Sequence, residues 1–130
     1  MIRRAGIGFR DVADVASVLD ALHRAGAEDI RCLALPEAKA GHPLLAALRT
    51  RGFDLTLIAA GDLARVPTLT ESPASRAAHG TGSVAEACAL CAAGPGARLL
   101  APRVISGDRL ATAAIAQRPD QIQIQTGEIG

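Results

Sequence analysis

The fold is decided by residues 2–26, which read IRRAGIGFRDVADVASVLDALHRAG. Residues 2–7 are predicted to form a short strand that ends in the Gly-Ile-Gly turn of residues 6–8. Asp11 is placed to open a helix, and apolar residues then recur at helical spacing. Gly26 stands where a left-handed C-terminal cap is needed. This stretch therefore predicts a strand, a glycine turn and a helix in succession.

The same alternation continues along the chain. Residues 30–35 and 53–59 are two further apolar runs of strand length. Pro43 lies between them, at the first turn of a predicted second helix. Alternating strands and helices favour parallel strands joined by right-handed crossovers, and such sheets bind ligands at the carboxyl ends of their strands. The loops that follow the strands are therefore the expected site.

The second half of the chain begins less regularly. Residues 67–82 are rich in Pro, Ser, Thr and Gly and are expected to form the longest irregular stretch. Ser83 and Glu86 then have the S-x-x-E spacing of a capping box. This spacing predicts the start of an Ala-rich helix that ends before the Gly-Pro-Gly of residues 94–96.

Two strands are predicted near the C-terminus, at residues 99–105 and 110–116, joined by a hairpin turn. The tail from Pro119 is expected to be loosely ordered. The whole pattern predicts an α/β fold. We expect a single three-layer domain over residues 1–130, with a mostly parallel sheet, helices on both faces and a C-terminal β-hairpin.

The composition argues against a nucleic-acid-binding protein and against a membrane protein. The net charge of +1 gives no basic field for nucleic acid, so no nucleic-acid partner is expected. No run approaches the roughly 20 apolar residues of a membrane span, and the N-terminal residues lack a signal peptide's apolar stretch. The protein is therefore expected to be cytoplasmic, without a membrane partner.

Two glycine pairs are candidate ligand-binding loops. Gly6 and Gly8, followed by Arg10, would let backbone amides and a cation approach a carboxylate or phosphate. Gly80 and Gly82 repeat the arrangement ahead of the predicted Ala-rich helix. The third glycine of a dinucleotide-binding fingerprint is missing, so we reject a nucleotide site. The alternative is that each pair only forms a tight turn.

Other polar residues are candidates for binding or catalysis. Glu37 and Lys39 lie beyond the second predicted strand, and Lys39 is the only lysine in the chain. Lys39, Glu86 and Ser75 are weak candidates for catalysis. A salt bridge is the alternative for Lys39, and helix capping is the favoured explanation of both Ser83 and Glu86.

The cysteines suggest no metal site. Cys88 and Cys91 fall inside the predicted Ala-rich helix rather than at its N-terminus, where a thiolate would be stabilised. Their role as small buried side chains is the better explanation. A zinc site would need two more ligands, and no pattern in the sequence indicates that Cys32 and His79 would supply them. We expect neither a metal nor a cofactor.

A resemblance to a known family rests on four ordered segments. They are GIGFR at 6–10, LALPEAK at 33–39, GSVAEACAL at 82–90 and TAAIA at 112–116. In this order they resemble the motifs of the CobE/CbiG C-terminal family. The resemblance implies a role in cobalamin biosynthesis, where longer members open the ring lactone of cobalt-precorrin 5A. Many members have a Cys after the first G-x-G, but Phe9 stands there and excludes a thiol mechanism at that position.

The resemblance implies a precorrin or hydrogenobyrinic acid-type tetrapyrrole as ligand, because these rings carry many carboxylates. The expected ligand-binding residues are Gly6, Gly8, Arg10, Glu37, Lys39, Ser75, Gly80, Gly82 and Ser83. Three functions stay open: an accessory or carrier module of the aerobic pathway, a hydrolase that opens a precorrin lactone, and a structural partner of another cobalamin biosynthesis enzyme.

Overall fold

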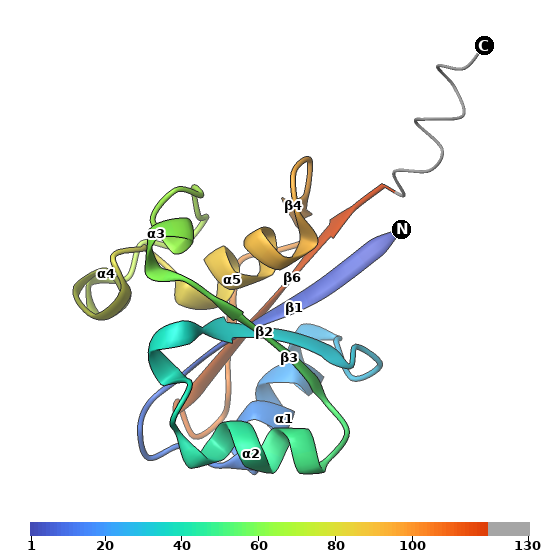
Figure 1. Ribbon diagram of the computed structural model, residues 1–130, viewed down its shortest axis with the longest axis vertical. Coiled ribbons are helices and arrows are strands. Elements are labelled where there is room, and N and C mark those ends of the chain that lie inside the picture. Colours follow the sequence, from blue (N-terminus) through green and yellow to red (C-terminus); the bar gives the residue numbers. More distant parts are fainter. Residues whose placement is uncertain (120–130) are drawn as a thin grey trace.

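A computed structural model of the chain describes residues 1–119 (Figure 1). A 3-10 turn, η1 (Glu37–Lys39), follows the second strand. The strands are β1 (Ile2–Phe9), β2 (Cys32–Pro36), β3 (Asp54–Ile58), β4 (Arg98–Leu99), β5 (Val104–Ile105) and β6 (Ala111–Arg118). The α-helices are α1 (Val15–Ala25), α2 (Pro43–Thr50), α3 (Ala60–Leu63), α4 (Pro73–His79) and α5 (Val84–Ala93).

The strands form one sheet in the order β3-β2-β1-β6-β4, and β5 also pairs with β6. β1, β2 and β3 are parallel, as the strand–helix alternation predicts. β6 runs antiparallel to β1 from Ile2↔Arg118 to Phe9↔Ala111. The predicted α/β fold with a C-terminal hairpin is confirmed, and β5 and β6 form that hairpin. The predicted strand 99–105 is divided into β4 and β5.

Helices cover both faces of the sheet (Figure 1). α1 and α2 lie on one face, where the main core cluster includes Ile7, Leu33 and Leu48. α5 and α3 lie on the other face, in a smaller cluster around Leu63 and Cys88. The sheet is therefore the middle layer of three, as predicted.

The glycines of residues 6–8 form no turn, and this prediction is wrong. Both lie inside β1, which continues to Phe9. A Cβ on Gly6 would lie 1.9 Å from the Ala85 carbonyl oxygen and 2.5 Å from the Ala89 amide nitrogen. The glycine is present because α5 packs with its backbone directly against β1, which leaves no space for a side chain.

The helix boundaries correct two further predictions. Asp14 rather than Asp11 caps α1, because its carboxylate accepts a hydrogen bond from the Ser17 amide at 3.0 Å. The stretch 67–82 is not wholly irregular, since it contains α4. Ser72 caps α4 and Pro73 occupies its first turn, which are the usual signals of a helix start.

The C-cap of α1 and the N-cap of α5 agree with the sequence. Gly26 adopts the left-handed conformation with a φ of 75°. The Ser83 hydroxyl accepts a hydrogen bond from the Glu86 amide. Within residues 1–119, every helix is too short or too polar to cross a bilayer. The expectation of a loosely ordered tail after Pro119 lies outside the described residues.

Candidate functional site

A cavity of about 440 Å³ opens where β1 and β2 end and β6 begins. It is lined by the end of β1, by η1, by α4 and by the β5–β6 hairpin. The position agrees with the rule that parallel sheets bind ligands at the carboxyl ends of their strands. The polar residues that line it are Arg10, Asp11, Lys39, Ser72, Ser75, His79, Arg103, Arg109 and Thr112.

The cavity concentrates positive charge. Arg10, Lys39, Arg103 and Arg109 line it, against one carboxylate, Asp11. The chain as a whole has a net charge of only +1. Within residues 1–119, the three arginine side chains make no hydrogen bond or ion pair, so their guanidinium groups are available to an anion.

Lys39 forms an ion pair with Asp11 in the lining of the cavity. Its Nζ donates to Asp11 Oδ1 at 2.6 Å and lies 4.8 Å from the centre of the Phe9 ring. The Lys39 side chain is 18% exposed and that of Asp11 is 84% exposed. The hydrogen bond and charge of Lys39 lower the pKa of Asp11. The lysine is therefore held in place between a carboxylate and an aromatic ring.

His42 holds the loop after β1 in place. Its Nε2 donates to the Asp11 carbonyl at 2.8 Å, and its Nδ1 accepts from the Leu44 amide at 3.0 Å. Its ring also packs edge-on against Phe9, with 4.9 Å between centroids. The two contacts assign the Nε2–H tautomer and tie the loop after β1 to the start of α2.

α4 contributes Ser75 and His79 to the lining of the cavity. The Ser75 hydroxyl accepts a hydrogen bond from the Val84 amide at 3.0 Å, which joins α4 to the start of α5. His79 is half-buried, and burial, followed by the charge of Lys39, lowers its pKa. Both effects favour the neutral imidazole. Sequence reasoning left His79 out of the binding residues, because a lone His beside a glycine loop gives no signal.

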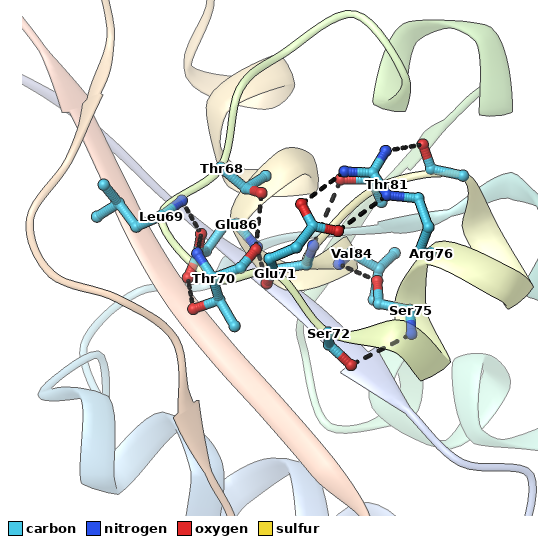
Figure 2. Close-up of polar contacts among 12 residues, drawn as sticks. Thr68, Leu69, Thr70, Glu71, Ser72, Ser75, Arg76, Thr81, Val84 and Glu86 are labelled. Atoms are coloured by element: carbon cyan, nitrogen blue, oxygen red, sulfur yellow. Dashed lines mark hydrogen bonds and ion pairs between the residues drawn. The ribbon is translucent and has the colours of Figure 1, made fainter.

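Glu86 holds the surrounding loops together (Figure 2). Its carboxylate is fully buried and accepts from the Leu69 and Thr70 amides, at 2.6 and 3.0 Å. It also accepts from the Thr70 hydroxyl at 2.6 Å and from the Arg103 amide at 2.8 Å. Burial raises the pKa of Glu86, but the four hydrogen bonds outweigh it and the net pKa is lowered.

This arrangement makes Glu86 a structural anion. Its side chain does not close the predicted capping box, because the Ser83 amide donates to the Thr81 hydroxyl instead. Glu86 binds the loop that leads to α4 on one side and the loop that carries Arg103 on the other. Two segments next to the cavity therefore depend on a residue that does not itself line it.

Comparison with known proteins assigns the chain to a family. The family model described as cobalamin synthesis G C-terminus matches residues 4–116. The chain belongs to this family. It is therefore a member of a cobalamin biosynthesis protein family, as the four sequence segments indicate. No curated protein matches the chain by sequence.

Three solved structures resemble this member of the cobalamin synthesis G C-terminus family. CobE, a protein from the cobalamin (vitamin B12) biosynthetic pathway, is 27% identical, with 91% of each chain covered and a TM-score of 0.76. The cobalamin biosynthesis protein chiG from Agrobacterium tumefaciens is 34% identical, with 92% of this chain and 100% of that chain covered and a TM-score of 0.68. A cobalamin biosynthesis protein G homologue from Sulfolobus solfataricus shares the fold at 18% identity, with 90% of this chain and 37% of that chain covered and a TM-score of 0.62.

The four segments that carry the resemblance to the cobalamin synthesis G C-terminus family converge on the cavity. Each contributes at least one lining residue: Arg10 from the first, Lys39 from the second, Val84 from the third and Thr112 from the fourth. Segments far apart in the sequence thus meet at one site, which is the feature that a binding surface requires.

The structure separates the predicted ligand-binding residues into two groups. Gly8, Arg10, Lys39 and Ser75 line the cavity. The others lie outside its lining and are Gly6, Glu37, Gly80, Gly82 and Ser83. Arg103 and Arg109 line the cavity but gave no signal in the sequence, because the β5–β6 hairpin alone brings them there.

Local structure explains why most of the predicted residues outside the cavity are glycine or serine. Gly80 caps α4 in the left-handed conformation, with a φ of 70°. A Cβ on Gly82 would lie 2.4 Å from the Thr70 carbonyl oxygen, so this glycine permits a close approach of two loops. Ser83 is fully buried as the cap of α5. Glu37 is exposed at the start of η1.

The cysteines form no metal site in the described part of the chain, where no three potential ligands cluster. Cys88 is fully buried in α5, and burial raises the pKa of its thiol. Cys91 is half-buried and its thiol lies 3.5 Å from the Asp62 carbonyl oxygen. Burial also raises the pKa of Cys91. Both thiols therefore stay protonated and weakly reactive at neutral pH.

Proposed function

We propose that this chain binds a precorrin or hydrogenobyrinic acid-type intermediate, as an accessory or carrier module of the aerobic route of cobalamin biosynthesis in the cytoplasm. The observation that carries the proposal is the cavity lined by four cations and one carboxylate in a nearly neutral chain. Such a site suits a ligand with several carboxylates, because arginine binds a carboxylate through two parallel hydrogen bonds. The cavity receives the carboxylate-bearing edge of the ring.

The contacts within the cavity favour binding over catalysis. The Ser75 hydroxyl is a hydrogen-bond acceptor of the Val84 amide and lacks a base bonded to it among residues 1–119. Lys39 is paired with Asp11, and Glu86 is buried away from the cavity. None of these three candidates is therefore free to activate water or attack an acyl carbon.

The proposal is tested by titrating the purified chain with hydrogenobyrinic acid and, separately, with earlier precorrins. Binding is followed by visible absorbance, and the recovered ligands are examined by mass spectrometry. We expect saturable binding, a ligand of unchanged mass, and affinity weakened about tenfold in Arg10→Gln through loss of a charge-assisted contact. The control is Arg98→Gln, an exposed arginine of β4 outside the cavity, which should bind as the wild type does.

Two other outcomes would overturn the carrier function. Precorrins that are recovered with a changed mass would favour a hydrolase that opens the ring lactone. Absence of any binding, with the protein folded, would favour a structural role beside another cobalamin biosynthesis enzyme.

The Lys39–Asp11 pair predicts an order of affinities. Lys39→Gln removes a cation and also leaves the Asp11 carboxylate unpaired at the cavity wall, where it repels an anionic ligand. The double variant Asp11→Asn/Lys39→Gln removes both charges. We expect the single variant to bind hydrogenobyrinic acid more weakly than the double variant, by roughly threefold to tenfold. Equal affinities would show that the ligand does not approach this pair.

A further inference from the structure

Arg109 has an unusual backbone conformation. Its φ is 63°, and it is the one non-glycine residue with a positive φ among residues 1–119. A left-handed conformation costs roughly 1–2 kcal/mol for a residue with a Cβ. Glycine, which adopts it without that cost, is the usual choice at such a position in a hairpin. The chain instead has an arginine whose side chain lines the cavity.

Hydrogen bonds hold the turn that carries Arg109. The Arg109 amide donates to the Ser106 carbonyl at 2.9 Å. Asp108 accepts from the Ser106 hydroxyl at 2.5 Å and from the Leu110 amide at 3.0 Å. These bonds hold residues 106–110 in a single closed turn.

The turn is also fixed to α1. The Ser17 hydroxyl donates to Asp108 at 2.6 Å, and the Gly107 amide donates to the Asp20 carboxylate at 2.6 Å. The hydroxyls of Ser106 and Ser17 lower the pKa of Asp108, so it remains a charged acceptor. The turn therefore forces Arg109 into its strained conformation and sets the place from which its side chain reaches the cavity.

Within residues 1–119, no contact of the Arg109 side chain offsets the cost of its left-handed backbone conformation. The Arg109 guanidinium has no hydrogen-bond or ion-pair partner within residues 1–119. We infer that Arg109 is a ligand-anchoring residue, which binds one carboxylate of the ring through two parallel hydrogen bonds. This inference rests on the proposed function and assigns to it a residue in the turn of the β5–β6 hairpin.

The test separates a binding role from a structural one. Arg109→Gly removes both the side chain and the strain, Arg109→Ala removes the guanidinium alone, and Arg109→Lys keeps the charge without the planar fork. Affinity for hydrogenobyrinic acid and its dependence on NaCl concentration are measured for each, with Arg98→Gln as control. Urea unfolding of the same proteins gives the stability.

We expect Arg109→Gly and Arg109→Ala to bind about tenfold or more weakly, with a shallower salt dependence, and Arg109→Lys to recover only part of the loss. The unfolding midpoint of Arg109→Gly should equal or exceed that of the wild type. Wild-type affinity in Arg109→Gly would overturn the anchoring role and leave the proposed function intact. A wild-type protein that binds no ligand would overturn both.

Discussion

Replacing Gly6 with alanine is expected to lower the free energy of unfolding by about 3 kcal/mol or more, at the upper end of overpacking effects. The new Cβ would lie 1.9 Å from the Ala85 carbonyl oxygen and 2.5 Å from the Ala89 amide nitrogen. Both atoms belong to the backbone of α5, so no side-chain rotation can relieve the overlap. The helix and β1 would have to move apart.

Urea denaturation followed by circular dichroism measures this effect. Gly61→Ala is the matched control, because a Cβ at Gly61 meets no atom within 4 Å. We expect the control to be as stable as the wild type or slightly more stable, since alanine is the better helix former. A Gly6→Ala protein with wild-type stability would show that α5 lies farther from β1 than described.

Replacing Glu86 with glutamine is expected to lower the free energy of unfolding by about 2–4 kcal/mol. The carboxylate accepts four hydrogen bonds, and the amide group that replaces one of its oxygens is a donor. The new amide group would then face either the Arg103 amide or the Leu69 and Thr70 amides, all of which are donors. The two loops that Glu86 binds would loosen, and because they lead to residues that line the cavity, ligand affinity should fall as well.

The effect of Glu86→Gln has a defined pH dependence. The folded-state pKa of Glu86 is lowered, so its contribution is present above the unfolded value of about 4.3 and is lost as the pH falls through the folded value. The difference between wild type and variant should therefore be largest at neutral pH and shrink on acidification. Glu37→Gln, at an exposed site, is the control. A difference that is constant from pH 7 to pH 3 would contradict a charged Glu86.

Local signals in the sequence were enough to predict much of the fold. Helix α1 has apolar residues at helical spacing and a glycine at its end, and Ser83 caps α5 through a contact between near neighbours. The parallel strands and the hairpin followed from alternation and turn residues. Each of these features depends on residues close together in the chain, where propensity and capping act.

Long-range packing explains what the sequence did not show. Gly6 resembles a turn glycine, but α5, some 80 positions later, makes it a packing glycine inside a strand. The spacing of Glu86 predicts a capping box, yet its carboxylate binds two distant loops. Neither contact leaves a periodic or adjacent signal.

Of the residues that line the cavity, the sequence analysis named Gly8, Arg10, Lys39 and Ser75 but neither Arg103 nor Arg109. Arg10 and Lys39 follow strands, and the rule for parallel sheets places them at the site. Arg103 and Arg109 reach the same cavity only because β6 pairs with both β1 and β5. A charge count along the chain cannot show this convergence, since the net charge is +1 while the cavity is strongly cationic.

The central claim is that the cationic cavity holds a carboxylate-bearing corrin-type ring. A crystal structure of the chain with hydrogenobyrinic acid tests it most directly. We expect ring carboxylates within hydrogen-bond distance of the guanidinium groups of Arg10 and Arg109. A ring bound instead in the apolar groove lined by Leu57, Leu90 and Pro95 would contradict it.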